Sequence, residues 1–224
     1  MSDPLALVPL AVAARGGRVD AHTARELVAA GVTLLQRCAP LVRALDGHRA
    51  AILLPASPAF LVALAASDGR AAVLIDPLTA PAEIARRLAG SNVGAAFTIT
   101  ALQPDLPAGF PRVLLDAAPL RAYAIFGDRT RDVDLGSHAG LPLEGDMDAP
   151  GRDEEAVIVH SPAPGSAVLT HRDLLAMARA TVLSANLGPA TVSHAPLTFS
   201  DPFALTALLL APLLAGGRVI TTPG

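Results

Sequence analysis

Short apolar runs alternate with stretches of helical periodicity along most of this chain, and this alternation constrains its fold more than any other feature. The runs have no polar face, which suits strands buried in a parallel sheet that is covered on both sides. Strands that alternate with helices of about ten residues indicate βαβ units. The sequence therefore predicts an α/β fold with a mainly parallel sheet flanked by helices.

The expected elements follow from these runs and from the helical periods between them. Strands are expected at 49–54, 71–75, 95–99, 112–115, 156–160, 191–195 and 218–221. Helices are expected at 24–44, with a kink or break at Pro40, and at 58–67, 81–88, 171–187 and 202–214. Thr23 begins a capping box with Glu26, and Ser57, Thr79 and Thr170 are the expected N-caps of later helices.

The middle of the chain has no clean period. Residues 117–155 are rich in Gly, Asp and Pro, and we expect loops there with one strand at 122–126. The acidic segment 145–155 (GDMDAPGRDEE) reads as a solvated connector, since its spacing does not match a calcium-binding loop. We expect one domain over 1–224, with a first βα part at 1–116, the connector at 117–155 and a second βα part at 156–224. Because the last run is a strand without a closing helix, this domain is expected to be truncated.

Composition excludes several classes of function. With 52% hydrophobic residues and 17% charged residues the chain is not typical of disordered proteins. A net charge of −3, few aromatic residues and no Trp argue against a nucleic-acid-binding protein. All 17 basic residues are Arg. No lysine is therefore present to form a Schiff base, act as a general base or clamp a phosphate.

The sequence shows no pattern typical of a metal site, a signal peptide or a membrane span. Cys38 is the single cysteine, so we expect a buried thiol and neither an internal disulfide nor a cysteine-based zinc cluster. The six histidines have no metal-binding spacing, and no metal ligand is assigned. The apolar start of the chain has Asp3 and two prolines where a signal peptide has positive charge, and the run 202–215 is too short to span a bilayer. A cytoplasmic protein without a membrane span is expected.

Four segments carry a resemblance to a known family. They are AILLPASPAFLVAL from Ala51, AAVLIDPLTAPAEIARRL from Ala71, EAVIVH with the later AVLTHRDLLA from Glu155, and APLTFSDPFALTALLLAPLLAGGRVI from Ala195. In this order they resemble the N-terminal part of the adenylate-forming (AMP-binding) superfamily, which includes acyl-CoA and aryl-CoA synthetases and peptide-synthetase adenylation domains. The resemblance implies part of the large N-terminal domain of those ligases, and the ATP-dependent activation of a carboxylate that goes with it.

The phosphate-binding loop of that family is degenerate here. The family loop is rich in Ser, Thr and Gly and ends in Pro-Lys-Gly, whereas residues 161–167 read SPAPGSA, a shorter stretch without Lys. Its two prolines have no N–H group to donate. The resemblance implies a remnant of a nucleotide site at Ser161, Gly165, Ser166 and Thr170. The alternatives are a tight structural turn at 161–167 and a helix cap at Thr170.

The acyl pocket of the family is also represented incompletely. The corresponding stretch, Thr198 to Asp201, lacks the histidine that the family often has, and the resemblance implies a pocket remnant at Phe199 and Phe203. No catalytic residue is assigned. The family segments that bind ribose and supply the catalytic lysine have no counterpart in these 224 residues.

Three functional hypotheses remain open. The first is a degenerate, non-catalytic homologue that acts as a binding or protein-interaction module and needs no cofactor. The alternative is an N-terminal fragment or subunit of an active AMP-forming acyl or aryl ligase, completed by another segment or chain, in which case ATP and Mg²⁺ are expected. The third is a carrier or binder of acyl or aryl carboxylates that uses the pocket remnant near Phe199 and Phe203. A truncated sheet exposes an edge and apolar helix faces such as those of Leu205, Leu208, Leu209 and Leu213, so we expect a homo-oligomer or a companion protein there.

Overall fold

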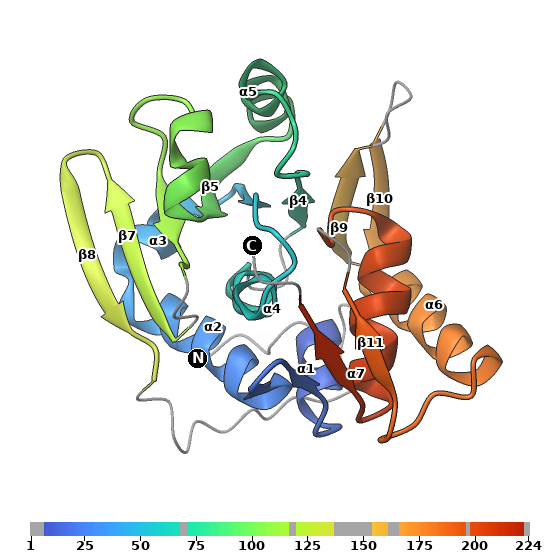
Figure 1. Cartoon of the computed structure of the whole chain (residues 1–224). Coiled ribbons are helices and arrows are strands. Elements are labelled where there is room, and N and C mark those ends of the chain that lie inside the picture. The colour runs from blue at the N-terminus through green and yellow to red at the C-terminus, as the bar shows by residue number, and fades with distance from the viewer. Residues whose placement is uncertain are drawn as a thin grey trace.

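The computed structural model of the chain describes residues 7–67, 71–116, 120–136, 154–160, 166–195 and 198–221. Its larger sheet has eight strands: β3 (Arg49–Ile52), β4 (Ala72–Leu74), β5 (Val93–Thr98), β6 (Arg112–Leu114), β7 (Arg121–Phe126), β8 (Arg129–Asp134), β9 (Glu155–His160) and β10 (Ser166–Thr170). Their order across the sheet is β10-β9-β4-β3-β5-β6-β7-β8. The strands β7 and β8 lie at one end of the molecule, and β9 and β10 at the other (Figure 1).

The centre of this sheet is parallel. Neighbouring strands from β9 through β4, β3 and β5 to β6 all run in the same direction. The strands β10, β7 and β8 are added antiparallel at the two ends. The expected fold class, a mainly parallel α/β sheet, is confirmed.

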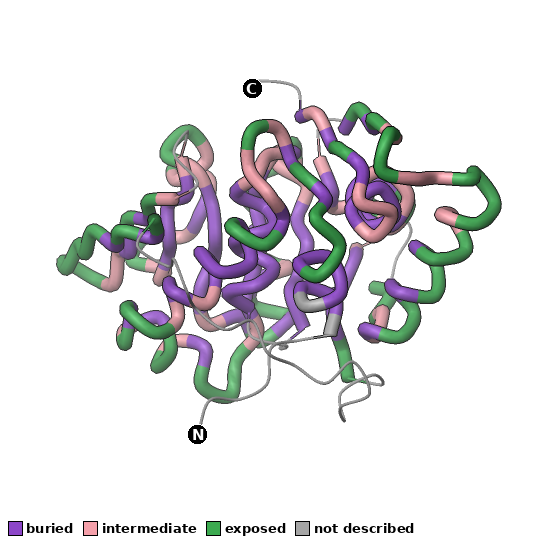
Figure 2. Tube along the Cα trace, turned by 90° about the horizontal axis from the view of Figure 1, so that it is seen from below, coloured by how far each residue is buried: buried purple, intermediate pink, exposed green. Residues whose placement is uncertain are grey.

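Helices cover both faces of the sheet. On one face α4 (Pro58–Ala66) lies between the strands and α2 (Ala24–Arg37), and its side chains from Ala59 to Ala66 are all buried. On the other face α5 (Pro81–Gly90) buries Ile84 and Leu88 in a smaller cluster. Side chains of successive strand residues point to opposite faces, so Leu74 belongs to the first core and Val73 to the second. The buried stretches gather in the middle of the molecule, as Figure 2 shows.

Local signals set most helix boundaries. At the start of α2 the Thr23 hydroxyl accepts a hydrogen bond from the Glu26 N–H at 3.2 Å, and the Glu26 carboxylate accepts one from the Thr23 N–H at 2.8 Å. The helix ends at Arg37 and α3 (Ala39–Ala44) follows with Pro40 in its first turn, which confirms the break. The expected cap at Thr79 is wrong, because Ala80 holds the N-cap position of α5 and makes no side-chain bond.

Two strands of the larger sheet were not expected, nor were β1 (Arg18–Val19) and β2 (His22–Thr23), which belong to a second sheet. The interval 117–155 contains β8 besides the expected strand, and β7 and β8 pair over six residues from Arg121↔Asp134 to Phe126↔Arg129. The strand β10 pairs with β9 in the interval between two expected elements. Neither β8 nor β10 has the apolar pattern of a buried strand, since β8 is mostly charged and β10 lies at the sheet edge with exposed residues. The acidic residues 145–153 lie outside the described part of the chain.

A second sheet joins the two ends of the sequence. Its strands are β1 (Arg18–Val19), β2 (His22–Thr23), β11 (Val192–His194) and β12 (Arg218–Ile220), in the order β11-β12-β1-β2. The last strand, β12, is paired on one side with β11 and on the other with β1, so it is not an edge strand. The edge strands of this sheet are β11 and β2.

The remaining helices pack beside this second sheet. They are α1 (Leu7–Ala13), α6 (His171–Ser184), the π-helical η2 (Ala204–Leu210) and α7 (Ala211–Leu214), while the 3-10 helix η1 (Thr100–Asp105) lies after β5. The expectation that the leucines of the 202–214 helix form an exposed face is wrong, because Leu205, Leu209 and Leu213 are fully buried and Leu208 packs against the same core. No helix in the described part of the chain has the length and apolar character that crossing a bilayer requires.

Candidate functional site

A cleft opens where the neighbouring parallel strands β4 and β9 end. The helix after β4, α5, packs on one face of the sheet, whereas α6, which follows β9 and β10, buries Leu174 and Leu175 on the other face. The crevice lies beyond the carboxyl ends of these two parallel strands, where ligands typically bind in open α/β sheets. The crevice has a volume of about 520 Å³, within the range of small-molecule sites.

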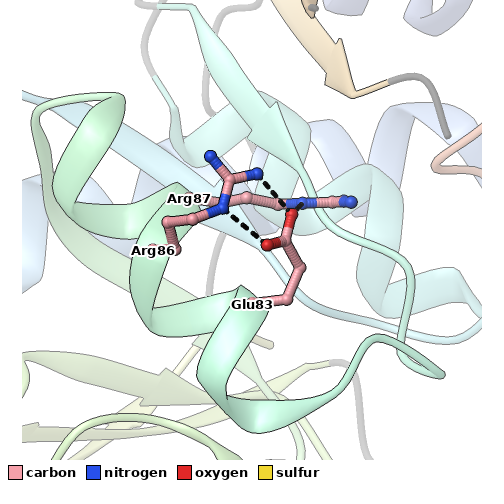
Figure 3. A network of polar contacts seen from close by, with 3 residues as sticks. All are labelled: Glu83, Arg86 and Arg87. Carbon is pink, nitrogen blue, oxygen red and sulfur yellow. Dashed lines mark hydrogen bonds and ion pairs between the residues drawn. The ribbon is translucent and has the colours of Figure 1, made fainter. Parts of the chain in front are cut away.

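One wall of the cleft carries positive charge. Arg87 of α5 lines it, and its Nε donates to Glu83 Oε1 at 2.6 Å. Arg86 holds the same carboxylate from its other side, with Nε to Oε2 at 2.6 Å and an Nη to Oε1 at 2.7 Å (Figure 3). These hydrogen bonds lower the pKa of Glu83 to about 2. Glu83 therefore stays ionised and fixes Arg87, whose side chain is only 15% exposed, at the cleft wall.

His160 completes this wall. It is the last residue of β9 and lines the cleft beside Val159. Its Nε2 atom is buried and makes no hydrogen bond with any described residue. Burial lowers the pKa of His160, and the nearby Arg87 and Arg86 lower it further, so the ring is neutral at neutral pH. A neutral imidazole offers one N–H donor and one acceptor to a ligand.

The cleft lining also contains two carboxylates, each of which already accepts hydrogen bonds from backbone N–H groups. Asp76 follows β4, and its Oδ1 accepts from the Leu78 N–H at 2.8 Å. Asp201 Oδ1 accepts from the N–H groups of Phe203 and Ala204 at 2.9 and 3.0 Å. These bonds hold the two turns that contribute these residues to the lining. The lining also includes Thr79 and Ser200.

The two candidate nucleotide residues that the structure describes, Ser166 and Thr170, do not line this cleft and lie at opposite ends of β10. Thr170 is the N-cap of α6: its hydroxyl accepts from the Asp173 N–H at 3.1 Å and donates to the Asp173 carboxylate at 2.8 Å, which confirms the helix-cap interpretation. Ser166 is exposed at the start of β10, opposite His160 in the strand pairing. Its neighbour Ala167 lines the cleft. Ser161 and Gly165 lie outside the described residues.

The two candidate pocket phenylalanines have different surroundings. Phe199 is fully buried and packs edge-on against Phe60 of α4, with ring centroids 5.2 Å apart. Phe203 is 66% exposed. Neither side chain lines the cleft, although the residues between them, Ser200 to Pro202, do. The stretch 198–203 thus borders the cleft through its polar residues.

Arg87, His160 and Asp76 were not among the site residues predicted from the sequence. A usable signal existed for two of them, since His160 ends the expected strand 156–160 and Asp76 directly follows the expected strand 71–75. Residues after parallel strands line the ligand crevice of such sheets. No comparable signal existed for Arg87, because its place in the cleft depends on how α5 packs.

The described residues do not fit a triphosphate with its metal. Arg87 is already paired with Glu83, His160 is neutral, and the carboxylates of Asp76 and Asp201 line the same cleft. No group of three His, Cys, Asp or Glu side chains that could hold a metal ion occurs among the residues that the structure describes. The positive wall suits one anionic group, such as a carboxylate or a single phosphate.

Comparisons with known proteins agree on the fold. Neither protein-family models nor curated protein sequences give a match to the chain. Among solved structures, the nonribosomal peptide synthetase FmoA3 is similar over 100% of this chain and 23% of its own, with a TM-score of 0.71 and 18% identity. ATP-bound MatB from Rhodopseudomonas palustris is similar over 100% of this chain and 43% of its own, with a TM-score of 0.66 and 18% identity.

A third solved structure extends this agreement. IdnL1 is similar over 94% of this chain and 40% of its own, with a TM-score of 0.69 and 18% identity. The chain thus has the fold of part of the adenylate-forming enzymes, and it spans less than half the length of these three structures.

Proposed function

We propose that this chain is a non-catalytic module that binds a small ligand with one anionic group in the cleft between β4 and β9. The observation that carries the proposal is the positive wall, where Arg87 and His160 lie together. His160 Nε2 is buried without a partner among the described residues, and a buried polar atom of this kind favours a ligand that bonds to it. The guanidinium of Arg87 supplies the charge.

Several features argue against adenylation by these residues alone. Adenylation develops negative charge on a phosphate, which preorganised donors and cations must stabilise. The sequence has no lysine and its loop 161–167 has two prolines in place of N–H donors. Loss of one preorganised donor costs on the order of 10²–10³ in rate. The remnant residues Ser161, Gly165, Ser166 and Thr170 therefore belong to the proposal as secondary contacts at most, and Phe199 and Phe203 as a border of the cleft.

A second candidate function rests on a separate observation. FmoA3 has been solved with AMPPNP and with alpha-methyl-L-serine-AMP, and this chain corresponds to 23% and 24% of those structures. The alternative is that the chain is the N-terminal part of an ATP-dependent ligase that another segment or chain completes. In that case ATP–pyrophosphate exchange is expected only after the missing part is added.

The test combines binding and turnover. Inorganic phosphate, AMP and a panel of carboxylic acids are titrated into the pure chain by calorimetry and thermal shift, and a ligand at 100 times its Kd is expected to stabilise the fold by about 2.7 kcal/mol. ATP–pyrophosphate exchange is measured with the same acids and is expected to be absent. Binding by no member of the panel contradicts the ligand site, and exchange by the isolated chain contradicts the non-catalytic assignment.

Matched variants localise the binding. Arg87→Gln and His160→Ala are expected to weaken binding at least about tenfold, because the first removes the positive charge of the wall and the second removes its imidazole. Arg86→Gln is the control, since Arg86 pairs with the same Glu83 but is 72% exposed and does not line the cleft. Equal effects of Arg86→Gln and Arg87→Gln would place the binding elsewhere.

A further inference from the structure

His160 brings an unused hydrogen-bonding atom into the cleft. The residue ends β9 and lines the cleft together with Arg87, and its Nε2 atom is buried without a hydrogen-bond partner among the described residues. Burial of a polar atom without a partner is costly, and burial of a charge without a counter-ion costs more. The ring is therefore held neutral while no anion is bound, although imidazole is the side chain that is most easily protonated just below neutral pH.

The charges near this ring are mostly positive. Helix α5 contributes Arg87 to the cleft lining and the more exposed Arg86 beside it (Figure 3). Glu83 of the same helix carries the opposite charge, but its carboxylate already accepts hydrogen bonds from both arginines. Burial has the largest effect on the pKa of His160 and lowers it, the two arginines lower it further, and Glu83 opposes them without reversing the shift.

The rest of the cleft offers the ring no counter-ion. Apart from Arg87, the charged residues of the described lining are Asp76 and Asp201, and each carboxylate already accepts backbone hydrogen bonds. None of the described carboxylates bonds to the buried Nε2 atom. A proton on His160 is therefore not neutralised by the chain itself.

Charged groups on the strands around His160 do not change this balance. Glu155 begins β9, at the other end of the strand, and pairs with Arg49 at 2.8 Å. The strands on either side of β9, β4 and β10, carry no charged residue. The charges that shift His160 are those of α5.

An anion in the cleft supplies what is missing. Its negative charge offsets that of Arg87, and its oxygen atoms accept the hydrogen bond that a buried N–H of the imidazolium has to donate. Coupling between two bound species is reciprocal, so an anion that favours the proton on His160 is itself bound more tightly when that proton is present.

We propose that anion binding in the cleft is coupled to the uptake of a proton by His160, so that the cleft holds anions more tightly in mild acid than at neutral pH. This inference rests on the ligand site described under the proposed function and adds its regulation. The affinity is expected to rise as the pH falls through the range in which the ring is protonated with an anion bound and neutral without one. At higher pH the ring is neutral in both forms and the coupling disappears.

The first experiment titrates inorganic phosphate into the full chain by calorimetry at pH 7.5 and pH 5.5, for the wild type and for His160→Gln. Glutamine keeps a neutral polar group at this position but takes up no proton. Phosphate itself gains a proton over this range, and that change enters both titrations alike. The ratio of the wild-type association constant to that of His160→Gln is expected to rise at least about fivefold from pH 7.5 to pH 5.5.

The outcomes separate this inference from the ligand site. A ratio that does not change with pH overturns the coupling and leaves the site in place. Failure of phosphate to bind at either pH overturns the coupling, and it overturns the site as well if no acid of the panel binds. His48→Gln is the matched control, because His48 precedes β3 and does not line the cleft, and it is expected to behave as the wild type does. Circular dichroism at both pH values checks that each variant is folded.

The second experiment follows the proton in the wild type and does not depend on the folding of a variant. The ring signals of the six histidines are titrated by NMR with and without saturating phosphate. One ring is expected to take up its proton at a higher pH when phosphate is bound, and its signal is the one that His160→Gln lacks. Unchanged midpoints for all six rings contradict the coupling.

Discussion

His160 links the chemistry of the cleft to the stability of the fold. Its Nε2 atom is buried, and burial together with Arg87 and Arg86 lowers the pKa of the ring below the usual 6.5. The unfolded chain therefore takes up a proton at a higher pH than the folded chain. The free energy of unfolding gains a contribution from His160 that is complete above pH 6.5 and is lost as the pH falls through the folded pKa.

We therefore predict that acid sensitivity depends on this one ring. Urea unfolding followed by circular dichroism at pH 7.5 and pH 5.5 is expected to show a larger loss of stability for the wild type than for His160→Gln. The variant removes a group that is neutral in the folded state and charges on unfolding at pH 5.5. The same loss of stability in both proteins would contradict this assignment.

Cys38 shows how burial controls reactivity. The thiol is fully buried between α2 and α3, and burial raises its pKa. Since the thiolate is the reactive form, we predict that iodoacetamide at pH 8 labels the folded chain more slowly than the urea-unfolded chain, by on the order of 10³ or more. Mass spectrometry of quenched samples measures the two rates. Similar rates would mean that this region opens without global unfolding.

At the scale of single elements, close backbone contacts limit which residues are allowed. Gly94 at the start of β5 lies so near α3 that an added Cβ would be 1.8 Å from the Ala44 carbonyl oxygen. Gly90 at the end of α5 has no heavy atom within 4 Å of such a Cβ. The two glycines are close in sequence, but Gly90 ends a helix with open space around it and Gly94 lies in a strand against backbone atoms.

We predict opposite effects for the same substitution at these two positions. Gly94→Ala is expected to destabilise the fold by about 1–3 kcal/mol or more, because backbone atoms cannot move aside as a flexible side chain can. Gly90→Ala is expected to leave stability unchanged or to raise it by up to about 1 kcal/mol, since Ala favours the helix. Urea unfolding of both variants provides the measurement. A neutral Gly94→Ala would disprove the close contact of α3 with β5.

Substitutions of Thr170, the N-cap of α6, can distinguish a structural role of this residue from a role in ligand binding. Thr170 bonds to Asp173 through both its backbone and its hydroxyl. We predict that Thr170→Ala costs about 1 kcal/mol of stability and that Thr170→Ser restores most of it, because Ser caps as well as Thr does. Neither variant is expected to change the affinity of the cleft for phosphate by more than about twofold. A large loss of affinity without a loss of stability would instead support the nucleotide remnant.

How far the sequence predicts each element depends on where its stabilising contacts lie. The apolar strand at 71–75 and the capping boxes at Thr23 and Thr170 contain their own signals, and they were predicted. The strand β8 is mostly charged and β10 is mostly exposed, so pairing with a neighbour, and not composition, makes them strands. The cleft follows the same rule. His160 ends an expected parallel strand, so its place in the cleft could have been predicted from the sequence. The place of Arg87 depends on how α5 packs and could not.

At the scale of the whole molecule, contacts distant in sequence hold the smaller sheet together and join it to the larger one. Asp20, before β2, accepts hydrogen bonds from the Thr221 N–H at 2.8 Å and from its hydroxyl, directly after β12. Phe199, which follows β11, packs against Phe60 on α4, which covers the larger sheet. One core cluster includes Phe60, Phe199 and Val219 of β12. The two sheets therefore share a core, and no local pattern in the sequence signals this connection.

A shared core predicts that both sheets unfold together. Tyr123 is the single tyrosine and the chain has no Trp, so its fluorescence reports on β7 in the larger sheet alone, whereas circular dichroism reports on all helices. Phe199→Ala removes a buried ring beside the smaller sheet and is expected to cost about 3–5 kcal/mol. Both signals are expected to shift to the same lower urea midpoint, because one cooperative transition moves every probe.

The neighbouring phenylalanine supplies the control for this experiment. Phe203 is 66% exposed, so Phe203→Ala is expected to change stability by no more than about 0.5 kcal/mol. If Phe199→Ala shifts the circular dichroism midpoint while the Tyr123 midpoint stays at its wild-type value, the two sheets unfold independently. The larger sheet would then be a separate folding unit, and the contact between Phe60 and Phe199 would join two units without coupling their stability.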